Sequence, residues 1–155
     1  MRGKRKFFIL LLFLFGFKKA NKVNSNYYGE IIAKYGRESF LTSTGFLLKI
    51  KDKEIVDSLP QILNLNIKIE PDSLKFNSFL YPSSELLKKI KEMNPQFYRK
   101  IEYVDPMSLT IYTKDKKIIR FGLGRFAKKI NYLKNLKEFK DSLNLEILSF
   151  LEGGK

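Results

Sequence analysis

The chain has 155 residues, of which 30 are Lys or Arg and 16 are Asp or Glu, and it contains neither Cys nor His. These absences exclude disulfides, thiolate chemistry, Ser-His-Asp triads and the usual zinc sites. With 44% hydrophobic and 14% aromatic residues, the composition predicts a folded domain rather than a disordered chain.

The positive charge is unevenly distributed along the chain. Residues 1–29 contain seven cations and no acid, so they supply half of the formal net charge of +14. The other residues carry 23 cations and 16 anions, mostly interspersed with apolar residues as on a solvated surface. Anionic lipid headgroups account for the N-terminal share, and no nucleic-acid partner is expected.

The N-terminus carries an apolar block with cations on both sides, a pattern typical of membrane segments. As a helix the block covers roughly 16 Å, which is shorter than a hydrocarbon core of about 30 Å. Because flanking lysines snorkel and bilayers thin, Lys4 to Lys22 can act as a short anchor. The apolar anchor residues are Phe7, Phe8, Ile9, Leu10, Leu11, Leu12, Phe13, Leu14, Phe15 and Phe17.

Three interpretations of this block stay open: an uncleaved anchor, a cleaved signal peptide and a buried core helix. Lys18 and Lys19 follow the block directly and no small-x-small cleavage site is present, which favours the anchor. Cations are more numerous before the block than after it, so the positive-inside rule favours a cytoplasmic N-terminus and an extracytoplasmic remainder.

Beyond the block the chain predicts a linker followed by one globular domain. We expect the basic tail and anchor over residues 1–22, a polar linker over 23–37 and the domain over 38–155. Glu30–Arg37, at the end of the linker, predicts a short helix that stops at Gly36.

The first part of the domain predicts β-structure. Phe40–Ile50 resembles a hairpin, because Gly45 stands between two runs of apolar or β-branched residues. Leu65, Ile67 and Ile69 alternate with polar residues, which is the period of a half-buried strand.

An amphipathic helix is predicted next, between Pro82 and the pair Asn94-Pro95 that ends it. Ser83 or Ser84 is expected to supply its N-cap oxygen. The apolar face of the helix consists of Leu86, Leu87, Ile90 and Met93.

A meander of three strands is predicted after this helix. We expect the strands at Tyr98–Val104, Ser108–Thr113 and Lys117–Phe121, with a turn at residues 114–116. Asp105 precedes a proline, so we interpret it as a turn residue rather than a catalytic carboxylate.

Gly122 and Gly124 then predict a tight turn rather than a phosphate site, because Ala127 stands where a dinucleotide motif needs its third glycine. A helix is expected over Phe126–Leu136 and a closing strand over Leu145–Leu151. The helix places Phe126, Ile130 and Leu133 on one stripe, and Lys128, Lys129, Lys134 and Lys137 mostly away from it.

The order of these elements resembles the β domain of the bacterial cell-division protein family FtsQ, also called DivIB. The likeness runs from the hairpin Thr44-Gly45-Phe46 through Leu59-Pro60 to the strand pair that ends at Phe121-Gly122. It continues in the helix that follows, and covers roughly residues 38–152. The POTRA module that family members usually carry before the β domain does not fit into residues 18–37. The matching helix residues are Phe126, Lys129, Ile130 and Leu133.

The resemblance implies a divisome scaffold of the bacterial inner membrane rather than an enzyme, with no cofactor and no metal. FtsQ-like proteins hold FtsB and FtsL beside the membrane during septum formation, and the partner adds a strand to the last strand of the β domain. Carried over by position, the partner-binding residues are Ile147, Ser149, Phe150, Leu151, Glu152 and Gly153.

The expected fold is therefore α+β: an N-terminal membrane helix, then a mixed or antiparallel sheet packed with two or three short helices. The alternative function is a membrane-tethered basic module that binds an acidic ligand, such as lipid or a cell-wall polymer, through its lysines. Salt distinguishes the two, because binding through lysines weakens steeply as ionic strength rises.

Overall fold

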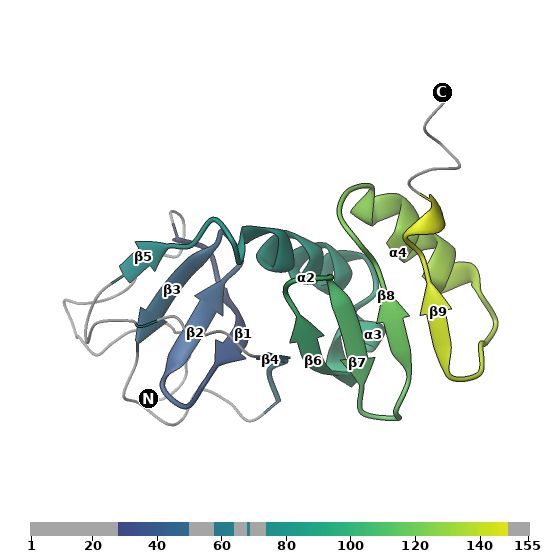
Figure 1. Ribbon diagram of the computed structural model, residues 1–155, viewed down its shortest axis with the longest axis horizontal. Coiled ribbons are helices and arrows are strands. Elements are labelled where there is room, and N and C mark those ends of the chain that lie inside the picture. The colour runs from purple at the N-terminus through teal and green to yellow at the C-terminus, as the bar shows by residue number, and fades with distance from the viewer. Residues whose placement is uncertain (1–27, 50–57, 64–67, 69–73, 149–155) are drawn as a thin grey trace.

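The computed structural model describes residues 28–49, 58–63, 68 and 74–148. Over these residues the fold is α+β, with one mixed nine-stranded sheet and three helices (Figure 1). The α+β class, the mixed sheet and the short helices are thus confirmed. The expected anchor lies outside the described residues, and none of the described helices is both long and apolar enough to cross a bilayer.

The nine strands follow the order β5-β3-β2-β1-β4-β6-β7-β8-β9 across the sheet. Neighbours pair antiparallel except β1 with β4, β4 with β6, and β8 with β9, which are parallel. Two meanders, β1–β3 with β5 and β6–β8, are therefore joined side by side through β4. The strands are β1 (Ile31–Tyr35), β2 (Ser39–Thr42), β3 (Phe46–Lys49), β4 (Gln61–Ile62), β5 (Leu74–Phe76), β6 (Ile101–Asp105), β7 (Thr110–Thr113), β8 (Ile118–Arg120) and β9 (Ser142–Asn144).

Strand β1 corrects two predictions, because it occupies a segment that we expected to be linker and helix. Ile32 and Ala33 are fully buried, and Lys34 pairs with Phe40 of β2 on one side and Gln61 of β4 on the other. Hydrogen bonding to neighbours on both sides outweighs the weak local preference for helix. The sheet domain therefore begins before residue 38.

The predicted hairpin is confirmed, with β2 and β3 joined at Gly45, whose φ is +94°. Strands β4 and β5 were not predicted, because two and three residues are too few to show a period. The strand predicted from the alternation of Leu65, Ile67 and Ile69 lies outside the described residues.

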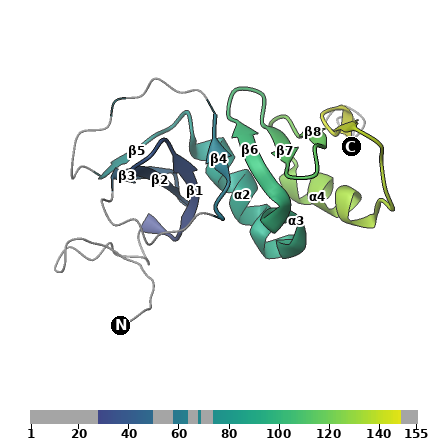
Figure 2. The same cartoon turned by 90° about the horizontal axis from the view of Figure 1, so that it is seen from below.

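The three helices, α2 (Tyr81–Met93), α3 (Pro95–Lys100) and α4 (Phe126–Asn135), lie on one side of the sheet (Figure 2). Four neighbouring strands each contribute one buried side chain to a row that faces these helices, and the strand register aligns the four. Each gains by leaving water, so this row forms the centre of the core. The row consists of Ile62, Val104, Ile111 and Ile119.

Helix α2 is confirmed with its apolar face buried, but the predicted serine N-cap is wrong. The helix begins at Tyr81, so Ser83 and Ser84 lie buried inside its first turn, and their side-chain hydroxyls have no hydrogen-bond partner among the described residues. The Asn77 side-chain oxygen accepts from the backbone N–H of Leu80 instead, at 3.0 Å.

Helix α3 was not predicted and occupies the start of the segment expected as the first meander strand. Asn94 caps it by accepting from the N–H of Phe97 at 3.2 Å. The hydroxyl of Tyr98 donates to the carbonyl of Ile32 in β1 at 2.7 Å, and this buried bond joins α3 to the other half of the sheet. The rest of the meander and α4 are confirmed.

Candidate functional site

The last described strand, β9, lies at one end of the described sheet and begins three residues before the predicted closing strand. The prediction of a strand over Leu145–Leu151 is wrong for its described part, because Ile147 and Leu148 form a helical turn. The strand lies earlier in the chain because of its alternating side chains. Leu143 and Leu145 turn toward the core, while Ser142 and Asn144 are exposed. This alternation starts before the more apolar run that suggested the strand.

The backbone of β9 bonds to β8 on one side. The N–H of Ile118 donates to the carbonyl of Asp141 at 2.9 Å, and the N–H of Leu145 donates to the carbonyl of Arg120 at 2.8 Å. Because backbone direction alternates along a parallel strand, the N–H and C=O groups of Ser142 and Asn144 point away from β8. No other strand pairs with β9 within residues 28–49, 58–63 and 74–148.

The predicted partner-binding residues do not form a strand in the described part of the chain. Ile147 is 55% exposed and lies three residues after Asn144, the last residue of β9. It lies in a turn that is closed by the N–H of Leu148 donating to Leu145 at 3.0 Å. The other five predicted residues, Ser149, Phe150, Leu151, Glu152 and Gly153, lie outside the described residues.

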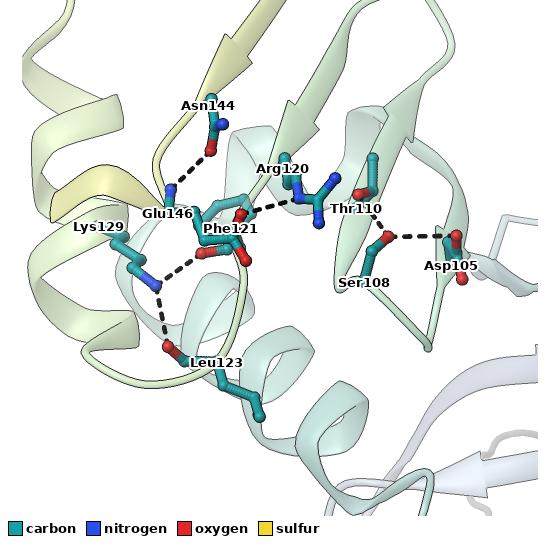
Figure 3. Close-up of polar contacts among 9 residues, drawn as sticks. All are labelled: Asp105, Ser108, Thr110, Arg120, Phe121, Leu123, Lys129, Asn144 and Glu146. Atoms are coloured by element: carbon teal, nitrogen blue, oxygen red, sulfur yellow. Dashed lines mark hydrogen bonds and ion pairs between the residues drawn. The ribbon is translucent and has the colours of Figure 1, made fainter. Parts of the chain in front are cut away.

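Polar contacts hold the end of β9 in place (Figure 3). The Glu146 carboxylate accepts from Arg120 Nε of β8 at 3.0 Å, and the Asn144 side chain accepts from the N–H of Glu146 at 2.9 Å. Gly122 lies against the same carboxylate side chain, since a Cβ there would stand 2.5 Å from Glu146 Cγ. Its φ of +67° also favours glycine.

Lys129 of α4 is fully buried beneath this region, although we expected it to face solvent. Its ammonium donates to the carbonyls of Phe121 at 2.6 Å and Leu123 at 3.1 Å (Figure 3). Burial lowers the pKa of Lys129, while the charge of Glu146 opposes that shift. The lysine therefore fixes the loop between β8 and α4. The sequence offers one signal for this burial: the lysine lies one helical turn inside a helix that follows a glycine turn.

The helix-free side of the sheet beside β9 carries a row of large side chains that sequence reasoning missed. Tyr103, Tyr112 and Ile118 are aligned across β6, β7 and β8, and Ser142 of β9 is next in the same register. Tyr103 and Ile118 are exposed. Each of these residues has a polar residue two positions away on the same face of its strand. This pattern indicates a row only once the register between the strands is known.

A second row on the same side is polar. Asp105 accepts from the N–H of Met107 at 2.9 Å and from the hydroxyl of Ser108 at 3.2 Å. The hydroxyls of Ser108 and Thr110 are 2.7 Å apart. Asp105 thus closes the turn between β6 and β7, as predicted. Among the described residues no three acidic side chains gather to hold a metal ion.

This arrangement suits recognition of an extended peptide: it combines an edge that no other described strand pairs with, an apolar row in the same sheet and polar contacts at the end of β9. No protein-family model matches the chain. Nor does it match any curated protein or solved structure significantly. The resemblance to the FtsQ/DivIB family therefore depends on the motifs and the order of elements alone.

Proposed function

We propose that the chain is a membrane-attached scaffold of the bacterial division apparatus that binds FtsB/FtsL-type partners by strand addition at β9. The observation that supports this function is the place of β9 at the end of the sheet, with Ser142 and Asn144 directed away from β8. An added strand satisfies such groups with its own backbone, and alternate side chains then supply specificity.

The other end of the described sheet is less suited to strand addition. Strand β5 pairs only with β3 among the described strands, and its middle residue is the exposed Lys75. A lysine on an edge strand discourages pairing, because its charge must be desolvated when another strand approaches. Strand β9 carries Ser142, Leu143 and Asn144, none of which is charged.

The row of Tyr103, Tyr112 and Ile118 supports a specific partner rather than any extended peptide. A strand added beside β9 places every second side chain on the helix-free side, next to Ser142 and in line with this row. Buried tyrosines dominate many interfaces, because they bring a large apolar area and a hydroxyl. Apolar side chains on the partner strand are therefore expected at alternate positions.

The proposal is tested by replacing Ser142 in the full chain and measuring capture of the FtsB–FtsL pair from the same bacterium. Ser142→Pro removes the outward N–H but leaves the backbone of Leu143 free to bond β8, and proline is tolerated at the first residue of a strand. We expect capture to be lost in Ser142→Pro and kept in the matched control Ser142→Ala.

A second variant, Ser149→Pro, separates β9 from the segment that follows it. Loss of capture in Ser149→Pro alone assigns docking to the predicted residues after β9 rather than to β9 itself. Undiminished capture by both proline variants, with circular dichroism unchanged, rejects strand addition at this end of the sheet.

The alternative, an acidic ligand bound through lysines, is less well supported because several lysines are committed within the molecule. Lys91 pairs with Glu30 at 2.7 Å, Lys117 donates to the Phe139 carbonyl at 2.7 Å, and Lys134 donates to Met93 at 3.2 Å. Measurement of partner capture against salt separates the two functions. A steep loss of binding with rising salt favours the acidic ligand.

A further inference from the structure

A second exposed apolar surface lies at the β5 end of the sheet, far from β9. Four rings form a continuous chain of contacts, which we name the aromatic cluster: Tyr28, Phe46, Phe76 and Tyr81. Ring centroids are 5.0 Å apart for Tyr28 and Phe46, 5.5 Å for Phe46 and Phe76, and 5.8 Å for Phe76 and Tyr81. The rings come from three stretches of the chain, because Phe76 and Tyr81 are only five residues apart.

Two of the four rings are exposed in spite of these contacts, and the other two are half-buried. Phe76 is 50% exposed and Tyr81 is 41% exposed. Apart from the row that contains Tyr103 and Ile118, exposed large apolar residues such as Met107 and Tyr132 are normal on a protein surface. Contiguous exposed aromatic rings instead mark a surface that another apolar phase covers.

The hairpin between β2 and β3 holds the cluster and the start of the domain together. Gly45 leaves room for two of the rings, since a Cβ there would lie 2.8 Å from Phe76 and 2.9 Å from Tyr81. In the same hairpin the hydroxyl of Thr44 donates to the carbonyl of Tyr28. The N–H of Glu30 donates to Ser43 Oγ at 3.2 Å. The chain therefore joins the domain at the cluster itself.

The sequence before Tyr28 indicates what covers the cluster. Tyr28 is eleven residues from Phe17, the last residue of the apolar N-terminal block. At about 3.6 Å per residue, these residues span at most about 40 Å. A block inserted in a bilayer therefore keeps the cluster close to the same bilayer, at a high effective concentration.

We propose that the aromatic cluster rests in the headgroup region of the membrane that holds the apolar block. This inference depends on the membrane attachment proposed above. Tyrosine and phenylalanine suit this position, because their rings gain by leaving water while the tyrosine hydroxyls stay hydrated at the headgroups. The surface is thus a second, peripheral membrane contact made by the domain.

The contact also determines which end of the domain faces the partner. Strands β5 and β9 lie at opposite ends of the molecule's long axis (Figure 1). Eight spacings of about 4.8 Å separate them, or roughly 38 Å across the sheet. With the cluster on the membrane, β9 is left uncovered and accessible to a partner.

The test uses full-length single-tryptophan variants, because the natural chain has no tryptophan. Phe76→Trp and Tyr81→Trp report on the cluster, and Tyr132→Trp on α4 is the matched control, since Tyr132 is similarly exposed at 46%. Phe13→Trp reports on the apolar block. The protein is reconstituted in vesicles of phosphatidylethanolamine and phosphatidylglycerol containing phospholipid brominated near the headgroups.

We expect bromolipid to quench the cluster reporters severalfold more strongly than Tyr132→Trp. Quenching of Phe13→Trp with neither cluster reporter quenched more than Tyr132→Trp overturns the peripheral contact and leaves the membrane attachment intact. Absence of quenching at Phe13→Trp as well overturns the attachment and this inference together. If Phe76→Trp fails to fold by circular dichroism, Tyr81→Trp decides between these outcomes.

Discussion

The two ends of the sheet differ in the kind of side chain that each exposes to solvent. At the β5 end, exposed aromatic rings pack against a hairpin, and a lysine lies in the edge strand. At the β9 end, the edge strand is short and uncharged, and its support is polar: an ion pair, an Asn side chain and a buried lysine. An apolar surface with a charged edge suits a lipid phase, and an uncharged edge suits another backbone.

The ends also differ in what a substitution should disturb. The hydrophobic effect that stabilises the β5 end is non-directional, so we expect small changes there to be absorbed. Hydrogen bonds at the β9 end are directional, and a buried carbonyl that loses its donor is left unsatisfied. The largest loss of stability is therefore expected where a buried charged donor is removed, and the smallest where an exposed ion pair is broken.

Lys129→Met is expected to destabilise the β9 end most. The variant keeps the length of the side chain but removes the ammonium that binds the carbonyls of Phe121 and Leu123. Hydrogen bonds from a charged donor contribute about 1.5–3 kcal/mol, so we expect a loss of about 2 kcal/mol in urea unfolding. Lys137→Met, at an exposed position, is the control and should leave stability unchanged. Equal stability of both variants contradicts the role assigned to Lys129.

Tyr98→Phe is expected to weaken the joint between the two halves of the sheet. It removes the buried bond to Ile32, at a loss of about 1 kcal/mol near neutral pH. Burial, with the charge of Glu30 adding to it, raises the pKa of Tyr98 well above its ordinary value.

The same tyrosine predicts a pH dependence. Above about pH 10 the unfolded tyrosine ionises while the folded one keeps its proton, so the stability that Tyr98 contributes falls as pH rises. Unfolding measured between neutral pH and this alkaline range should show a shallower decline in Tyr98→Phe than in the natural chain. Parallel declines would show that Tyr98 ionises in the folded state as easily as in the unfolded state.

Gly122→Ala and Gly36→Ala form a matched pair, because φ is +67° at Gly122 and +71° at Gly36. Both variants strain the backbone by about 1 kcal/mol. Only Gly122→Ala meets a neighbour, Glu146, whereas nothing lies within 4 Å of a Cβ at Gly36. Thermal unfolding should therefore show the larger loss for Gly122→Ala. The reverse order contradicts the close packing of Glu146 on this turn.

Glu146→Gln is expected to have the smallest effect on stability. It breaks the ion pair with Arg120, but both side chains are partly exposed. Solvent-exposed pairs contribute about 0.2–1 kcal/mol, so we expect a loss of no more than about 0.5 kcal/mol. Added salt should reduce the difference from the natural chain, since screening weakens the pair. A loss as large as that of Lys129→Met would reverse the ranking proposed for this end.

The elements that could be predicted from sequence are those with a local signal. The hairpin at Gly45, helices α2 and α4 and the meander β6–β8 each show a periodic pattern or a turn residue. Strand β1 could not be recognised, because its conformation depends on neighbours that are distant in sequence. The same cause hid the row of Tyr103, Tyr112 and Ile118.

The candidate site was predicted only in outline. We predicted an edge strand over Leu145–Leu151, whereas the edge strand of the described sheet is Ser142–Asn144, because the longer apolar run was favoured over the shorter alternation before it. The position of Lys129 was missed because lysine is assumed to face solvent, and its burial depends on two carbonyls that only the folded loop brings close.

Amide hydrogen exchange at β9 tests the central claim most directly. The measurement compares the full chain alone with the full chain bound to the FtsB–FtsL pair, residue by residue. The account predicts that the amides of Ser142 and Asn144 become protected on binding, while that of Leu143, which already faces β8, changes little. Unchanged exchange at Ser142 and Asn144 in a saturated complex would contradict strand addition at this edge.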